Sequence, residues 1–130
     1  MNEDQQRRES GSASLDLVLV FPAVLFALAA LVQGALWAHG DHVVDAAARE
    51  GARAARLSGN PTAGKAGAEA FLHRYGRDVI LSPDVAADVK AGVARVTVQG
   101  RAVPLLPGLA LPLRATSSGE VERFVPAVAQ

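Results

Sequence analysis

The chain has 130 residues, half of them apolar, and its 13 basic and 13 acidic side chains leave a formal net charge of zero. Proteins that bind nucleic acid neutralise its phosphates with an excess of Lys and Arg. We therefore expect no nucleic-acid partner. Because the chain contains no cysteine, disulfides, thiolate metal ligands and a cysteine nucleophile are excluded.

The first ten residues are polar and include five charged side chains between Glu3 and Glu9. With no large apolar side chain after Met1, this segment is predicted to be disordered and solvated. We interpret residues 1–11 as a cytoplasmic leader that a peptidase can remove.

Residues 17–37 form an apolar run without a charged side chain. At 1.5 Å per helical residue, such a run reaches roughly 30 Å, the thickness of a bilayer's hydrocarbon core. We predict a membrane span here, with Trp37 as an interfacial anchor. A secretory signal peptide has an apolar stretch of only about 7 to 15 residues, so removal by ordinary signal peptidase is the weaker interpretation.

Asp16 lies at the edge of this run, where a carboxylate opposes insertion. A cut between Gly11 and Ser12 would make Ser12 the first residue and Asp16 the fifth. The new α-amino group on one subunit could then pair with Asp16 of a neighbour, which offsets the cost of placing both charges in lipid. The alternative is that Asp16 is a helix-terminal acid favoured by the helix dipole.

Two features of the run bear on its shape and packing. Pro22 removes a backbone hydrogen bond and is predicted to bend the helix. Ala30, Gly34 and Ala38 recur every four residues and form a face of small side chains, through which helices approach closely in lipid. The alternative is that alanine is simply abundant in this chain.

The helix is predicted to continue beyond the membrane, so that residues 12–57 form one long helix. Its outer half has no proline and is amphipathic, with Val44, Ala48, Ala52 and Ala55 on one face. This face is expected to hold a small domain, residues 58–130. The span and the domain together predict an α+β fold.

Within that domain, Asn60 and Pro61 are typical of a helix start, and Gly76 of a helix end. An apolar stripe between them consists of Ala68, Phe71, Leu72 and Tyr75. Gly64 and Gly67 are expected to weaken this short helix.

Later, apolar residues alternate with a period of two over residues 85–89 and 94–98, around a turn at residues 90–92, which predicts a hairpin. Residues 111–115 suggest a third antiparallel strand and residues 121–125 a fourth. The proline-interrupted loop at residues 103–109 is expected to cap the core rather than contact a partner.

Catalytic patterns are poor. His39 and His42, with Asp41 and Asp45, are expected to be solvated polar side chains, because a metal site needs at least three converging ligands. There is no phosphate-binding glycine loop after a strand. We expect neither an enzyme nor a metal, a cofactor or a small-molecule substrate.

Gly11, Ser12 and Asp16, followed by residues 17–22 and then by the Ala- and Arg-rich residues 46–56, resemble the TadE-like family, the pilin-like minor proteins of tight-adherence pilus systems. The similarity extends to residues 106–108 and 121–124. Asp16 stands where the family usually has Glu, and Leu17 where related major pilins often have an aromatic residue.

Charge counting on the two sides of the span favours neither orientation. The resemblance implies a cytoplasmic N-terminus and a C-terminal domain outside the cell membrane. It also implies a prepilin peptidase, an inner-membrane pilus platform and other pilin-like subunits as partners. Two alternatives stay open: a permanent single-span envelope scaffold subunit, and a secreted binding module with a cleaved signal.

Overall fold

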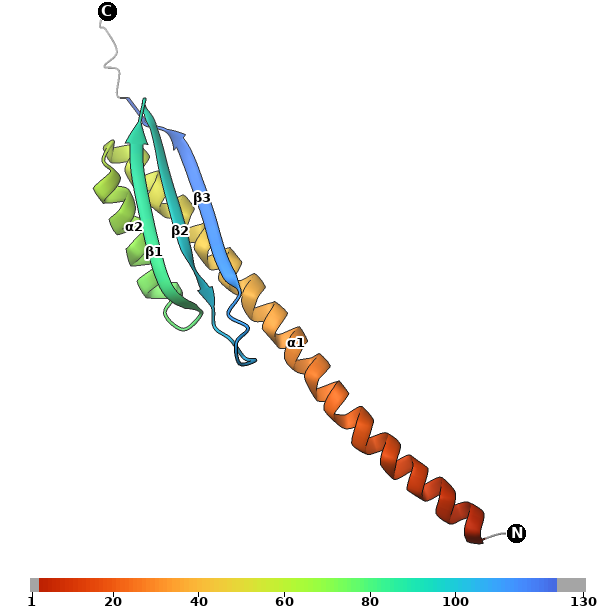
Figure 1. Ribbon diagram of the computed structural model, residues 1–130. Coiled ribbons are helices and arrows are strands. Elements are labelled where there is room, and N and C mark those ends of the chain that lie inside the picture. The colour runs from red at the N-terminus through yellow and green to blue at the C-terminus, as the bar shows by residue number, and fades with distance from the viewer. Residues whose placement is uncertain (1–2, 124–130) are drawn as a thin grey trace, which may run out of the picture.

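The computed structural model describes the backbone of residues 3–123 and the side chains of residues 11–123. It contains two helices and three strands: α1 (Glu3–Ser58), α2 (Pro61–Tyr75), β1 (Ile80–Lys90), β2 (Val93–Ala102) and β3 (Pro112–Glu120). Both helices lie on one face of the sheet, while the N-terminal half of α1 projects away alone (Figure 1). The predicted α+β fold is confirmed.

Helix α1 is a single element of 56 residues, about 84 Å long at the rise of an α-helix. It begins at Glu3, so the disorder predicted for the leader is wrong from this residue onward. The leader is rich in Glu, Gln and Arg, which are good helix formers, and extending an existing helix needs no new nucleation. Pro22 lies inside α1, and the bend expected there stays a prediction.

The core forms where the outer half of α1 meets α2 and the sheet. The predicted face of α1 is confirmed, since Val44, Ala48 and Ala55 are fully buried and Ala52 is 3% exposed. Val43 and Ala47 of α1 also belong to the core. The other core residues come from α2 and the sheet: Ala68, Leu72, Ile80, Val85, Val96, Val98, Ala102 and Leu113.

Helix α2 has the predicted ends. The Asn60 side chain accepts a hydrogen bond from the Thr62 N–H at 2.9 Å, and the Gly76 N–H donates to the Leu72 carbonyl at 2.7 Å. The predicted apolar stripe is buried only in part, because Tyr75 is 54% exposed. Its ring lies on the surface beside that of Phe71, with centroids 4.8 Å apart.

The glycines of α2 serve helix packing. A Cβ at Gly64 would lie 2.8 Å from the Ala55 Cβ, and one at Gly51 only 2.7 Å from the Gly64 carbonyl oxygen. A Cβ at Gly67 would lie 3.2 Å from the Ala54 Cβ. The backbones of α1 and α2 therefore approach more closely than larger residues at these positions would allow. Helix propensity alone does not indicate this role of the glycines.

The sheet is antiparallel with the order β1-β2-β3. Lys90 pairs with Val93, and the two residues between them, Ala91 and Gly92, have φ of 51° and 77°. Positive φ at both positions of a two-residue loop is the geometry that matches strand twist. The predicted hairpin and third strand are confirmed, although β3 is longer than expected.

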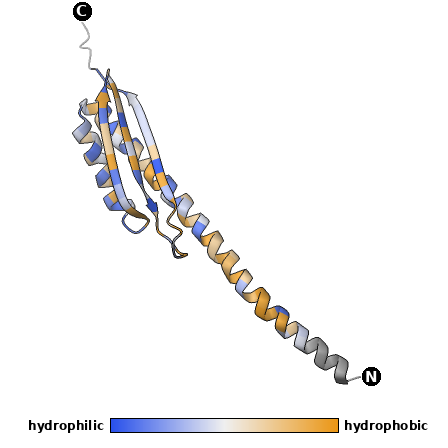
Figure 2. Cartoon of the chain, viewed as in Figure 1, coloured by the Kyte–Doolittle hydropathy of each residue, from blue (hydrophilic) through white to orange (hydrophobic). Residues whose placement is uncertain are grey.

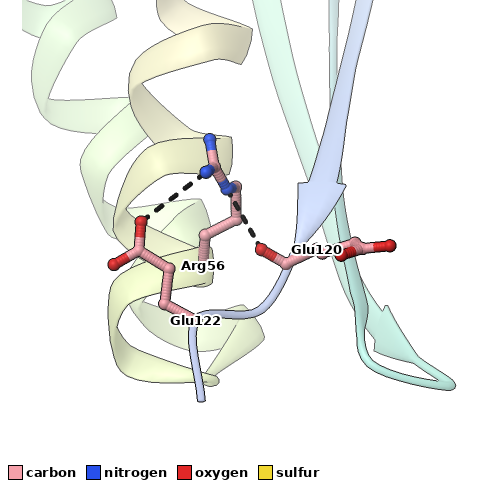
Figure 3. A network of polar contacts seen from close by, with 3 residues as sticks. All are labelled: Arg56, Glu120 and Glu122. Carbon is pink, nitrogen blue, oxygen red and sulfur yellow. Dashed lines mark hydrogen bonds and ion pairs between the residues drawn. The ribbon is translucent and has the colours of Figure 1, made fainter. Parts of the chain in front are cut away.

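Residues 121–123 are irregular, and the remainder of the predicted fourth strand lies outside the described residues. The chain here turns toward the end of α1: the Glu122 N–H donates to the Arg56 carbonyl at 3.1 Å. The Arg56 side chain makes two further contacts. Its Nε donates a hydrogen bond to the Glu120 carbonyl at 3.2 Å, and its guanidinium forms an ion pair with the Glu122 carboxylate at 3.6 Å (Figure 3). The backbone after β3 thus keeps one hydrogen bond to the turn between β1 and β2, from the Val121 N–H to the Gly92 carbonyl at 2.7 Å, and then joins α1.

Candidate functional site: the exposed apolar half of α1

The most unusual surface of the protein is the half of α1 that precedes the domain. Between residues 15 and 32, every large apolar side chain is between 47% and 74% exposed. These side chains belong to Leu15, Leu17, Val18, Leu19, Val20, Phe21, Val24, Leu25, Phe26, Leu28, Leu31 and Val32. Figure 2 shows this part of α1 as predominantly hydrophobic around the helix.

Its apolar window has a mean hydropathy of 2.6, and none of that window is buried inside the protein. A helix that is hydrophobic all round is normally covered by lipid or by other protein. Length and composition therefore make α1 a candidate for a single membrane span.

The predicted processing residues lie within α1. Gly11 and Ser12 are exposed, and a Cβ at Gly11 would have nothing within 4 Å. The peptide bond between them is part of α1. Gly11 weakens the helix locally, because glycine is about 1 kcal/mol less favourable than alanine in a helix.

Asp16 is exposed as well. It follows Ser12 by four residues in the same helix, so the two lie on one face, one turn apart. The carboxylate is therefore close to the position that a new α-amino group at Ser12 would occupy, at the end of the apolar surface.

The small-residue face is left open by the fold. Ala30, Gly34 and Ala38 are all exposed, and a Cβ at Gly34 would have nothing within 4 Å. Since each helical residue adds about 100°, Gly34 points about 100° away from the buried neighbour Gln33. The small domain thus covers one side of α1 and leaves this face for another contact.

Gln33 is a residue whose importance the sequence reading missed. It is only 1% exposed, and both ends of its amide bind the loop between β2 and β3. Its Oε1 accepts hydrogen bonds from the N–H groups of Leu105 at 2.6 Å and Leu106 at 3.4 Å. Its Nε2 donates to the Val103 carbonyl at 3.3 Å. The sequence signal for this role is that Gln33 is the one amide side chain within the apolar run of residues 17–37.

Trp37 also contacts the domain, because its indole N–H donates to the Pro112 carbonyl at 3.3 Å. The side chain remains 40% exposed. The last turn of the predicted span 17–37 therefore already lies beside the domain, and the part of α1 free of the domain ends near Val32.

Comparison with known families bears on this helix. Residues 11–53 match the family model described as TadE-like protein. The similarity covers most of α1 and less than half of the chain. The match ends before α2, so it includes neither residues 106–108 nor residues 121–124. The searches of curated proteins and of solved structures each found no match.

The TadE-like segment contains each site residue predicted from the sequence, from Gly11 to Ala38. It also contains two residues that hold the domain in place, Gln33 and Gly51. Among the described residues, no three His, Cys, Asp or Glu side chains lie close enough together to hold a metal ion.

Proposed function

We propose that this protein is a pilin-like, single-span membrane protein that contributes to tight-adherence pilus assembly or secretion. Its N-terminus faces the cytoplasm and its small domain lies outside. One observation carries the proposal: the TadE-like helix exposes an uncharged apolar surface from Leu17 to Val32 and holds a folded domain only on its far half.

This division suits a subunit that is stored in a membrane and then assembled. In the bilayer, lipid covers the apolar half of α1. In an assembly, helices of other pilin-like subunits replace the lipid, and the face formed by Ala30, Gly34 and Ala38 allows close backbone approach. The folded domain need not change, because its core uses other residues of α1.

The N-terminal end supplies the polar part of the mechanism. A prepilin peptidase cuts between Gly11 and Ser12 and frees an α-amino group at the membrane face. The Asp16 carboxylate of a neighbouring subunit pairs with that amine, so neither charge remains alone in lipid. An inner-membrane pilus platform then moves the subunit.

The test is the mature N-terminus, measured by mass spectrometry in cells that have an active prepilin peptidase. We expect Ser12 as the first residue. Gly11→Leu should leave a full-length membrane-bound precursor, because a bulky side chain blocks the cut site. The matched control is Gly34→Leu, the same substitution in open space away from the cut bond, which should leave processing unchanged.

Other N-termini point to other functions. A protein that keeps residues 1–11 despite an active peptidase refutes processing and favours a permanent envelope scaffold subunit. A cut at the end of the apolar run, with release of the domain, favours a secreted binding module.

A further inference from the structure

The loop between β2 and β3 lies at the end of the domain nearest the exposed half of α1 (Figure 1). Residues 103–111 contain no charged side chain. Leu105 is 50% exposed and Leu109 is 41% exposed. The loop therefore adds apolar surface to the domain beside the helix that is proposed to cross the membrane.

Gln33 fastens this loop to α1. Its three hydrogen bonds hold the backbone of Val103, Leu105 and Leu106, and the amide is almost completely buried. Buried amides of this kind are costly to leave without partners. The loop is consequently held on α1 directly after Val32, the last residue of the exposed apolar stretch.

The length of that stretch places the loop relative to a bilayer. From Leu17 to Val32 the helix is about 24 Å long, somewhat less than the roughly 30 Å of a hydrocarbon core. If the apolar stretch fills the core, its outer end lies at the boundary between acyl chains and headgroups. The loop fastened at Gln33 then lies at the same depth.

The charged side chains nearest to the loop all lie outside it, both along α1 and along the flanking strands. Along α1, the first charged side chain after Asp16 is Asp41, two turns past Gln33. On either side of the loop, the nearest charged residues are Arg101 and Arg114, and both are exposed. Insertion of the loop would desolvate no ionised side chain. It would remove the exposed apolar surface of Leu105 and Leu109 from water, which lowers the free energy.

We propose that Leu105 and Leu109 insert into the interfacial zone of the bilayer that α1 crosses, so that the protein contacts the membrane at a second point. This inference rests on the single-span anchor proposed above. The second contact would restrict rotation of α1 about its own axis and hold the domain against the lipid surface. The face formed by Ala30, Gly34 and Ala38 lies about 100° around α1 from Gln33, so it remains available for another helix.

The experiment measures the depth of single labelled positions in the full chain. Because the protein has no native cysteine, single cysteines can carry an environment-sensitive fluorophore at Leu105 and Leu109. Leu25→Cys reports the span itself, because Leu25 lies near the middle of the apolar stretch and is 51% exposed. Leu57→Cys is the matched control, since Leu57 is 58% exposed but lies at the opposite end of the domain. Each variant is reconstituted in phosphatidylcholine vesicles with nitroxide lipids.

We expect shallow nitroxides to quench the labels at positions 105 and 109, with a blue shift of emission, and deep nitroxides to quench position 25. Position 57 should show neither effect. If position 25 is quenched but positions 105 and 109 behave like position 57, the loop proposal is overturned and the anchor stands. If position 25 also escapes quenching, both are overturned. The substituted leucines of the loop are exposed, and a thermal melt of each variant verifies its fold.

Discussion

Asp16 lies where one carboxylate has a large effect, at the polar edge of an otherwise uncharged surface. If it pairs with a neighbour's N-terminal amine, Asp16→Ala should still insert and be processed, because it removes a charge and leaves the cut site intact. Assembly should fail, since the amine then enters lipid unpaired. Asp16→Glu should be tolerated because it keeps the carboxylate.

The readout is the amount of assembled pilus compared with the amount of processed subunit in the membrane. Equal assembly by Asp16→Ala and the wild type would show that the carboxylate only stabilises the helix terminus, as a dipole-favoured acid does.

Gln33 has a structural role that can be measured separately from assembly. Gln33→Ala leaves the N–H of Leu105 and the carbonyl of Val103 without their partner in a partly buried place. We expect a loss of about 1–3 kcal/mol in the free energy of unfolding. Denaturant titration of the full chain in detergent micelles provides the measurement.

The matched control is Gln99→Ala, which removes the same amide from an exposed position on β2. It should change stability by no more than about 0.5 kcal/mol. Equal effects of the two substitutions would contradict the role assigned to Gln33.

The contact between α1 and α2 depends on glycine. In Gly51→Ala, the new methyl group would lie 2.7 Å from the Gly64 carbonyl oxygen and 2.9 Å from the Ala68 Cβ. Alanine gains up to about 1 kcal/mol in helix propensity, but overpacking of a core costs about 1–3 kcal/mol. We expect the cost to win, because the nearest obstacle is backbone, and the melting temperature to fall.

The comparison is Gly34→Ala in the same helix. Here the methyl group meets nothing within 4 Å, so only the gain in propensity remains and the melting temperature should not fall. The opposite signs are decisive: if both substitutions raise the melting temperature, the helices are not in the close contact described.

The chain directly after β3 contacts the end of α1. A fourth strand is predicted over residues 121–125, yet residues 121–123 are irregular. The carbonyl of Arg56 at the end of α1 accepts the Glu122 N–H, and the aliphatic stem of Arg56 lies against Gly119, where a Cβ would come within 2.7 Å of it. The end of the long helix thus binds the chain directly after β3.

For the molecule as a whole, the domain is expected to depend on α1. The strands and α2 bury mainly Ala and Val side chains, and a small domain without disulfides buries too little area to exceed its ordering entropy by much. Much of the core belongs to α1, including Val44, Ala48 and Ala52. A soluble fragment of residues 38–130 should therefore fold weakly, whereas residues 60–130 should not fold.

Circular dichroism and thermal melting of the two fragments provide the measurement. A cooperative melt of the shorter fragment at the temperature of the longer one would contradict the dependence on α1. The longer fragment lacks Gln33, so its β2–β3 loop is expected to be less ordered than in the full chain.

Local chemistry was sufficient for most of the elements. The apolar run of residues 17–37, the Asn60 cap and the Gly92 turn each involve neighbours in sequence. Helix rise, capping and positive φ are local properties of the backbone. The sequence alone therefore determined a long apolar helix, an amphipathic continuation, a capped second helix and a hairpin.

Only the tertiary structure showed which side chains also hold separate segments together, because the residues that they contact are distant in sequence. Gln33 binds a loop about 70 residues away, and a lone amide in an apolar run does not indicate such a partner. Gly64 looked unfavourable by helix propensity, although its value depends on the distance to Gly51. Propensity and periodicity describe a residue and its neighbours along the chain, whereas the depth of the loop and the closeness of the helices depend on how separate segments pack.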